Sequence, residues 1–306
     1  MTTPRRMHDD EPDIDRALVA GLLADQFPRW AALPLRYVAS DGTSNLLLRL
    51  GDDLAVRMPR TPGAAADVPG ERAALRRLAP GLPCAVPEPV GAGVPGRGYP
   101  WPWSVHRWID GVLPEAGADR QPAQLARDVA DFVRALGRAD TTGAPAAERG
   151  GPLAPRDAET RAALARLDGA VDTAAALALW ESALAAPRRD GPAVWVHGDL
   201  EPGNLLVDAD SGRLAAVIDF GCTGVGDPAV DLIVAWYVLD DGLRDTFRAA
   251  VGCDDAAWTR GRGWALSIAA LELSYYRGRN AFMADNAARV LGRLLGRPVP
   301  RGLTRS

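Results

Sequence analysis

The sequence predicts an α+β chain of two lobes, with a small β-rich half followed by a larger and mostly helical half. Three observations predict this class. Short β-like runs dominate the first hundred or so residues, helical spacing dominates after Gly111, and residues 193–232 return to three short apolar runs that carry polar side chains. We place the boundary near residues 108–111, which gives an N-terminal lobe of residues 1–108 and a C-terminal lobe of residues 109–306.

The composition is that of an ordinary globular protein and disfavours several kinds of partner. The chain has 306 residues, of which 47% are hydrophobic and 24% charged, and its net charge is −4. This charge gives no basic surface for nucleic acid, and no run approaches the roughly 18 apolar residues of a membrane-spanning helix. The polar N-terminal segment and three scattered cysteines favour a cytoplasmic protein without a disulfide framework. We therefore expect a small-molecule partner, and the oligomeric state stays open.

The sequence contains no lysine, so arginine supplies all 35 basic side chains. A GC-rich coding bias would account for this, together with the many Ala, Gly and Pro residues. The chemical consequence is independent of the cause. The chain offers no lysine for a Schiff base, and it has no P-loop because that motif needs a lysine on the phosphates.

The first lobe is expected to hold a small sheet with helices. Ile14, Leu18 and Leu22 fall at helical spacing, and Gly-Asp-Asp at 51–53 is a plausible hairpin turn between two β-like runs. A segment punctuated by Pro and Gly over 80–103 is expected to be a connector. The expected elements are, in order, a helix over 14–27, strands over 45–50 and 53–58, a helix over 70–79 and a strand from Ser104.

Helical periodicity governs most of the second lobe. Leu125, Val129, Phe132 and Leu136 lie on one helical face, and the Gly/Pro/Ala-rich residues 140–155 indicate a loop. Helical spacing resumes after Asp231 and continues to about Gly296. The expected elements are helices over 124–136, 161–167 and 173–184, strands over 194–196, 205–207 and 214–218, and further helices to the end.

The stretch HGDLEPGN, residues 197–204, connects two of these strands and carries polar side chains next to buried runs. Loops and strand ends on a rigid scaffold are where catalytic groups tend to lie. Asn204 and Asp219 offer hard oxygen ligands of the kind that Mg²⁺ takes. Asp199 offers a carboxylate that can accept a proton from a hydroxyl. One base, one amide ligand and one carboxylate ligand are the minimum equipment for phosphoryl transfer from a nucleotide.

The order HGDLEPGN, then IDFG, then GDPAVDL resembles the aminoglycoside phosphotransferase family, which shares the bilobal protein-kinase-like fold. The resemblance covers most of the chain and implies roles. Asp199 would be the catalytic base, Asn204 and Asp219 would bind Mg²⁺, and ATP or GTP would be the phosphoryl donor. The residues for which it implies a structural role at the site are His197, Asp227 and Asp231. Asp199, Asn204 and Asp219 are expected to converge on one pocket that holds a divalent ion beside a triphosphate.

The donor side of the resemblance contains a departure. Kinase-like folds place a lysine on the third strand, paired with a glutamate on the next helix. Here that position falls on Arg57, with Glu71 as its partner and Arg60 as a competing candidate. Arginine keeps the charge, but its planar fork makes the exchange a non-neutral one.

Two further segments are candidates for nucleotide contacts. Between the first strands, Ser40, Thr43 and Ser44 could cap phosphate oxygens; an ordinary turn is an equal alternative. The backbone of Arg107 and Ile109 aligns with the hinge that would face a purine edge, with Trp108 or Trp103 as nearby apolar walls. The sequence does not separate ATP from GTP.

The acceptor is expected to be a hydroxylated small molecule, an aminoglycoside or a macrolide antibiotic. The tentative substrate residues are Glu201, Glu272 and Tyr276. Glu272 lies in an apolar helix and is either a surface acid or a substrate anchor. Two alternatives stay open, namely a metabolic small-molecule kinase acting on choline, homoserine or a sugar, and a nucleotide-binding module without turnover.

Overall fold

The structure is a computed structural model that describes residues 11–38, 44–114 and 122–296. Two compact units divide the chain. The first unit takes in Met1–Gly111 and Ala215–Gly221, and the second takes in Val112–Leu214 and Cys222–Ser306. The segment Ala215–Gly221 lies within residues 193–232, the stretch with three apolar runs and polar side chains. That stretch therefore contributes to both units.

The first unit is built on a five-stranded antiparallel sheet in the order β1-β2-β3-β5-β4. The central strands β2 and β3 form a hairpin in which Leu47 lies opposite Arg57, and Arg57 lies opposite Ser104 on β5. The strands are β1 (Leu35–Tyr37), β2 (Asn45–Leu50), β3 (Leu54–Pro59), β4 (Pro89–Gly93) and β5 (Trp103–Arg107).

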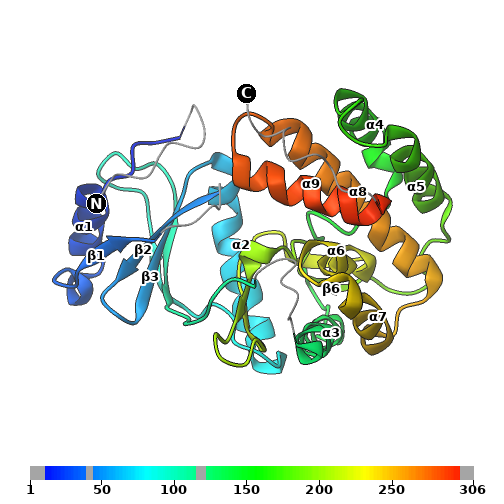
Figure 1. Cartoon of the computed structure of the whole chain (residues 1–306). Coiled ribbons are helices and arrows are strands. Elements are labelled where there is room, and N and C mark those ends of the chain that lie inside the picture. Colours follow the sequence, from blue (N-terminus) through cyan, green and yellow to red (C-terminus); the bar gives the residue numbers. More distant parts are fainter. Residues whose placement is uncertain (1–10, 39–43, 115–121, 297–306) are drawn as a thin grey trace. The chain divides into compact units, whose positions relative to one another are not determined.

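One face of this sheet is covered by helix α1 (Arg16–Gln26), which Figure 1 shows beside β1 and β2. Alternate residues of β2 are buried because side chains in a strand alternate between its two faces. Leu48 and Val56 pack with Leu22 of the helix and with Trp103 in one apolar cluster. This apolar packing holds the β2–β3 hairpin, and with it the backbone of Arg57, in a fixed position.

Helix α2 (Pro62–Leu78) begins eight residues before the predicted start at residue 70. Thr61 caps it, since its side chain accepts a hydrogen bond of 3.2 Å from the N–H of Ala64, and Pro62 suits the first helical position. The sequence prediction missed this start because Pro69 lies inside the helix and its surroundings are rich in Gly and Ala. A short 3-10 turn, η2 (Ala79–Gly81), follows it, as η1 (Pro28–Trp30) follows α1.

The prediction of a plain connector over 80–103 was wrong for residues 89–93, which form β4 at the edge of the sheet. An edge position tolerates proline, because an edge strand need not donate on both sides. This strand has no hydrophobic alternation, which is why its sequence gave no strand signal.

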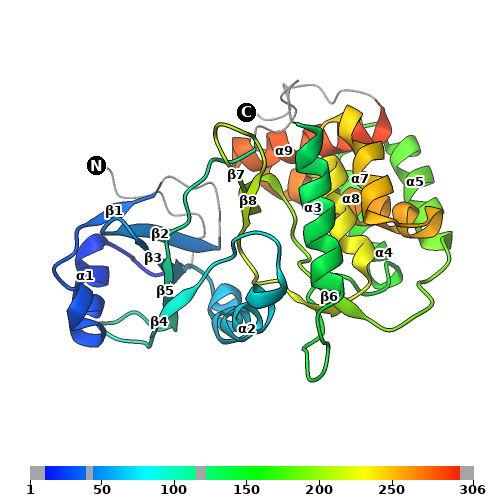
Figure 2. The same cartoon turned by 90° about the horizontal axis from the view of Figure 1, so that it is seen from below.

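Helices make up most of the second unit. Figure 2 shows α3 alongside α7, and Figure 1 shows α8 alongside α9. They are α3 (Ala123–Gly137), α4 (Asp157–Arg166), α5 (Thr173–Ala185), α6 (Val234–Tyr237), α7 (Arg244–Val251), α8 (Asp255–Tyr276) and α9 (Ala281–Leu295), with 3-10 turns η3 (Ala154–Arg156), η4 (Pro202–Asn204), η5 (Pro228–Ile233) and η6 (Asp241–Leu243).

Short strands frame the loop of residues 197–204. Strand β6 (Val194–Val196) precedes it, β7 (Leu205–Val207) follows it, and β8 (Leu214–Val217) comes next. Strand β9 (Gly224–Gly226), which the sequence did not predict, pairs antiparallel with β6. Gly224 is required there, because a Cβ at this residue would lie 2.4 Å from the backbone N of Ala147.

The predicted fold class, a small β-rich N-lobe and a larger, mostly helical C-lobe, is confirmed. In the described ranges, none of the helices combines the length and the apolar character that crossing a membrane requires.

Candidate active site

The loop HGDLEPGN is anchored by hydrogen bonds to Asp231, a buried carboxylate of η5 in the second unit. Its two oxygens accept hydrogen bonds of 2.9 Å from the N–H of His197 and 2.8 Å from the N–H of Gly198. Burial raises the pKa of Asp231 above its usual range, and the nearby His197 and these two N–H groups oppose that rise. The carboxylate thus satisfies backbone donors of the loop, which is the structural role expected for it.

His197 and Gly198 shape the start of the loop. The ring Nδ1 of His197 accepts a hydrogen bond of 3.2 Å from the N–H of Asp199, and the ring packs edge-on against Phe132. Gly198 adopts φ +81°, and a Cβ there would lie 3.2 Å from the carbonyl oxygen of Cys222. A glycine is therefore needed immediately before Asp199.

Two side chains hold the Asp199 carboxylate. Arg149 forms an ion pair with it, and Nδ2 of Asn204 donates hydrogen bonds of 2.8 Å to Oδ2 and to the carbonyl oxygen of Asp199. Burial lowers the pKa of Arg149, but Asp199 and neighbouring acids raise it to above its usual value, so the guanidinium stays charged.

Sequence reasoning missed Arg149. It lies in the Gly/Pro/Ala-rich segment before α4, 50 residues from Asp199, where no motif distinguishes it from other arginines. Its guanidinium also reaches the carbonyl oxygen of Gly198 at 3.4 Å. The residue therefore binds both the backbone and the carboxylate of the loop.

A second acidic cluster lies in the same unit. Glu201 is 9% exposed and interacts with Glu272 of α8, whose Oε2 accepts a hydrogen bond of 2.9 Å from the hydroxyl of Tyr237. Burial raises the pKa of Glu272 to about 7, which Arg149 opposes. Burial, and then the charges of Glu272 and Asp199, raise the pKa of Glu201 well above its usual range.

The structure brings two of the three tentative substrate residues together, Glu201 and Glu272. Tyr276 is the last residue of α8, one helical turn beyond Glu272, and its ring contacts Tyr275 edge-on at 4.9 Å. Glu272 is partly exposed, and its carboxyl group is turned toward Tyr237 of α6.

In the first unit, Arg57 joins two carboxylates. Its guanidinium donates to Oε1 of Glu71 at 2.5 Å and to Oδ1 of Asp219 at 3.1 Å. Glu71 also accepts a hydrogen bond of 3.1 Å from the N–H of Phe220. Burial lowers the pKa of Arg57, but Glu71 and Asp219 more than offset this effect and raise it. The strand arginine and the helix glutamate are thus paired as expected.

The competing candidate, Arg60, has a different partner. It forms a buried ion pair with Glu11 at 3.1 Å, and only 7% of its side chain is exposed. Its guanidinium is therefore engaged away from Glu71, and Arg57 is the better candidate for the phosphates.

Asp219 has φ +62°, in the left-handed region that residues other than glycine rarely adopt. Aspartate tolerates this region better than most residues. Such backbone strain is found preferentially at functional sites. With 38% of its side chain exposed, Asp219 remains accessible beside Arg57.

The hinge candidates lie at the end of β5. The N–H of Arg107 donates to the carbonyl oxygen of Glu88 at 3.0 Å, and the N–H of Trp108 donates to that of Asp53 at 2.8 Å. Among the described residues, the N–H of Ile109 has no hydrogen-bond partner. Ile109 is thus a better backbone donor for a base than Arg107, whose N–H is committed.

The remaining nucleotide candidates lie in the loop before β2. Ser40 and Thr43 fall outside the described residues. Ser44 is exposed, and its carbonyl oxygen accepts a hydrogen bond of 2.9 Å from the N–H of Arg60.

Asp227 is committed to structure as well. Its carboxylate accepts from the N–H of Ala229 at 3.0 Å, which caps η5, and from Nε of Arg260 at 2.6 Å. Arg260 also donates to the carbonyl oxygen of Pro187 at 2.5 Å. This pairing leaves Asp227 poorly suited to receive a cationic substrate.

The oxygen ligands expected for Mg²⁺ fit that ion in their chemistry. The amide nitrogen of Asn204 is used by Asp199, which leaves its carbonyl oxygen, and within the described ranges that oxygen accepts no hydrogen bond. The second carboxylate oxygen of Asp219 likewise has no partner among the described residues. Mg²⁺ takes few protein oxygens and keeps several waters or phosphate oxygens.

Comparisons with known proteins agree with the fold. The profile of the phosphotransferase enzyme family, APH, matches residues 37–264. No curated protein sequence matches the chain. Solved structures of similar fold align with 90–96% of this chain. Because they are only 16–24% identical to it, this likeness shows the fold alone.

Three of these structures illustrate the likeness. The GDP and kanamycin complex of APH(2")-IIia has a TM-score of 0.74 at 19% identity and covers 92% of this chain and 99% of its own. ADP-bound aminoglycoside phosphotransferase APH(2'')-Ib has a TM-score of 0.61 at 16% identity, with 96% and 100% covered. Macrolide 2'-phosphotransferase MphH from Brachybacterium faecium, as the apoenzyme, has a TM-score of 0.58 at 24% identity, with 90% and 97% covered.

Proposed function

The chain belongs to the phosphotransferase enzyme family, and we propose that it transfers the γ-phosphoryl group of ATP or GTP to a hydroxyl group of an aminoglycoside or macrolide antibiotic in the cytoplasm. The observation that carries the proposal is the arrangement around Asp199. A rigid loop presents this carboxylate, and Arg149 and Asn204 fix its orientation.

In the proposed reaction, Asp199 accepts the proton of the acceptor hydroxyl. The acceptor oxygen forms a bond to the γ-phosphorus as the bond from that phosphorus to the β-phosphate oxygen breaks, and the nucleoside diphosphate leaves. Positioning supplies most of the acceleration in such transfers. Arg149 and Asn204 serve this purpose, because they hold the carboxylate in one orientation.

The donor would lie against the first unit. Arg57 would bind phosphate oxygens while Glu71 fixes its guanidinium, and the N–H of Ile109 would donate to the base. Asn204 and Asp219 would hold Mg²⁺, which would neutralise charge on the phosphates. The GDP and ADP complexes of the similar structures support a nucleotide donor.

The acceptor class is proposed from the Glu201–Glu272 pair. Two neighbouring carboxyl groups are a favourable partner for an amine, since a cation offsets the repulsion between them. Aminoglycosides and many macrolides carry such amines. Kanamycin is bound in one of the similar structures, and another is a macrolide phosphotransferase.

The experiment combines an acceptor panel with a variant. The purified chain, Mg²⁺ and ATP or GTP are incubated with kanamycin, a macrolide, choline and homoserine, and each acceptor is examined by mass spectrometry for the gain of one phosphate. Asp199→Ala is expected to lower kcat by about 10²- to 10⁴-fold, the usual contribution of a general base, and to leave nucleotide affinity nearly unchanged.

Asp190→Ala is the matched control, because Asp190 is an exposed aspartate of the same unit. It is expected to keep full activity. Full turnover by Asp199→Ala would refute the assignment of the base. Phosphorylation of choline or homoserine alone would refute the antibiotic substrate and leave the phosphotransferase chemistry intact.

A further inference from the structure

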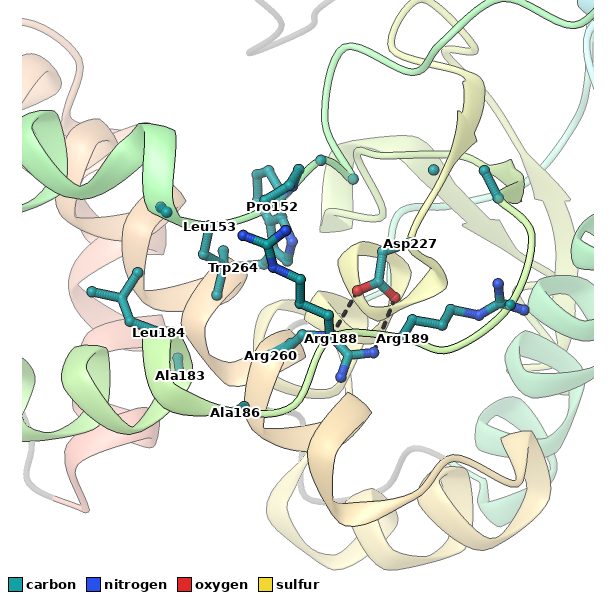
Figure 3. Close-up of a pocket in the computed structure, with 16 residues that line it drawn as sticks. Pro152, Leu153, Ala183, Leu184, Ala186, Arg188, Arg189, Asp227, Arg260 and Trp264 are labelled. Carbon is teal, nitrogen blue, oxygen red and sulfur yellow. Dashed lines mark hydrogen bonds and ion pairs between the residues drawn. The ribbon is translucent and has the colours of Figure 1, made fainter.

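A cavity of about 270 Å³ opens in the second unit between the end of α5, the loop after it, and α8 (Figure 3). Its floor is rigid. At Gly263 of α8 the two helices approach so closely that a Cβ would lie 2.5 Å from Cβ of Ala183. Leu153 and Trp264, 6% and 3% exposed, provide apolar walls beside that contact. The cavity is thus a preformed feature of packed elements.

The charge of the cavity is positive. Three arginines and one aspartate line it, which leaves an excess of two positive charges. Arg260 and Asp227 cancel each other, since their side chains form the ion pair described above. The excess therefore rests on Arg188 and Arg189.

These two arginines point in different directions. Figure 3 shows the Arg188 side chain extending across the cavity toward Pro152, whereas Arg189 extends away from it. The guanidinium of Arg189 donates to the carbonyl oxygen of Pro192. Within the described residues, Arg188 has no hydrogen bond and no ion pair. Arg188 is thus an exposed cation at the edge of the cavity, with no counter-charge paired to it in this part of the structure.

The volume of the cavity and its net positive charge limit which ligands it can accept. A dry cavity of about 150 Å³ holds one benzene molecule, so 270 Å³ holds a ligand of roughly ten to fifteen non-hydrogen atoms. This volume is smaller than a nucleotide or an antibiotic, and the excess positive charge disfavours a cationic acceptor.

We propose that this cavity is a binding site for a small organic anion, a carboxylate or phosphate monoester carried on an apolar or aromatic body. Arg188 binds the anionic group through charge-assisted hydrogen bonds, and the apolar body lies against Trp264 and Leu153. The site is separate from the proposed donor and acceptor residues, so it does not depend on the proposed function.

The test is calorimetric titration of the full chain with phenyl phosphate and with benzoate, in the presence of Mg²⁺ and excess ADP to occupy a donor site. Both anions are expected to bind at one site, and the preferred one identifies the anionic group. Benzyl alcohol and inorganic phosphate, each of which lacks half of the recognition, are expected to bind at least tenfold more weakly.

Two variants locate the binding. Arg188→Gln is expected to weaken it by about tenfold or more, the usual effect of losing a hydrogen bond to a charged group. Ala154→Phe, an exposed change at the wall that narrows the cavity, is expected to weaken it similarly. Arg138→Gln changes an exposed arginine that caps the C-terminus of α3 outside the cavity, and it is the control with the same charge change.

Binding that none of these variants alters would overturn the site. The site would also be overturned if neither phenyl phosphate nor benzoate bound at millimolar concentration. Because Arg188→Gln changes an exposed side chain, circular dichroism and an unaltered melting temperature would show that any loss is local.

Discussion

Arg57 occupies the position where the resemblance to kinase-like folds implies a lysine, and its hydrogen bonds show what an arginine adds there. One planar guanidinium donates to Glu71 and Asp219 at once, at 2.5 and 3.1 Å. A lysine ammonium is a compact point charge, whereas the arginine fork spans two acceptors. The exchange therefore keeps the helix glutamate in place and adds a link to the segment that carries Asp219.

Another single residue, His106 of β5, is buried beside this group. Its Nε2 lies 2.8 Å from Oγ of Ser104, while its Nδ1 is buried without a hydrogen-bond partner among the described residues. Burial, and then the charge of Arg57, lower the pKa of His106 to about 3. The imidazole is thus neutral at physiological pH and adds no charge next to Arg57.

Glu272 gives a prediction about stability. Its pKa is about 7 in the folded chain against 4.5 for an ordinary glutamate. The folded state therefore holds a proton that the unfolded state releases between pH 4.5 and 7, and stability falls as pH rises through that window. Glu272→Gln removes this loss and keeps an acceptor for Tyr237. We expect it to raise the free energy of unfolding at pH 8 by up to about 3 kcal/mol, with little change at pH 4.5.

Urea denaturation at the two pH values measures this effect. Glu88→Gln, where 64% of the side chain is exposed, is the control and is expected to leave both values unchanged. A Glu272→Gln variant that is equally destabilised at both pH values would show that packing, and not the buried charge, dominates at this residue.

Among the elements, η5 supports the loop of residues 197–204 that carries the proposed base, Asp199. Asp231 within it accepts from two backbone N–H groups, and Asp227 at its start is tied to α8 through Arg260. We predict that Asp231→Asn lowers the free energy of unfolding by about 2–3 kcal/mol, because an amide replaces one acceptor with a donor and leaves a buried N–H unsatisfied. Phosphotransferase activity is expected to fall with it.

The measurement is urea denaturation together with nucleotide affinity. Asp241→Asn, a mostly exposed carboxylate near the same helices, is the control for charge removal. If Asp231→Asn kept both stability and activity, the loop would not depend on this support.

The sequence predicted the elements that carry their own pattern. The bounds of β6 and β7 agree with the prediction residue for residue, because short apolar runs flanked by turn formers are clear signals. β4 and β9 were missed because their residues, largely Pro, Gly and Ala or Val, pair through backbone geometry alone. The early start of α2 was missed because its cap, Thr61, is followed by two prolines and two glycines, residue types that normally interrupt or end a helix.

At the site, the sequence identified residues that belong to motifs and missed those that do not. Asp199, Asn204, Arg57 and Glu71 could be predicted because each has a fixed spacing within a recognisable stretch. Arg149 could not, since its contact with Asp199 depends on how a distant loop folds back. The hydrogen bond between Tyr237 and Glu272, which lie 35 residues apart, could not be predicted for the same reason.

On the scale of the whole molecule, the proposed binding of Mg²⁺ and nucleotide is coupled to folding. A ligand that binds the folded chain and not the unfolded chain stabilises the folded state by mass action. We predict that Mg²⁺ with ADP at 100 times its Kd raises the free energy of unfolding by about 2.7 kcal/mol.

Differential scanning fluorimetry with and without Mg²⁺ measures the corresponding rise in melting temperature. Asp219→Asn and Asn204→Ala are each expected to reduce the part of the rise that depends on Mg²⁺, and Asp190→Asn is expected to preserve it. A rise that does not change when Mg²⁺ is withheld would contradict the metal assignment, independently of any acceptor.

The replacement of lysine by arginine throughout the chain has a consequence for control in the cell. Acetylation, isopeptide-linked ubiquitin-like tags and amine-reactive inhibitors all modify the lysine side chain. This sequence offers no lysine to any of them. Kinase inhibitors that acylate the strand lysine would find only Arg57, a guanidinium that does not lose its proton under working conditions. The proposed phosphate-binding cation is therefore not open to the commonest covalent modifications that would inactivate such a site.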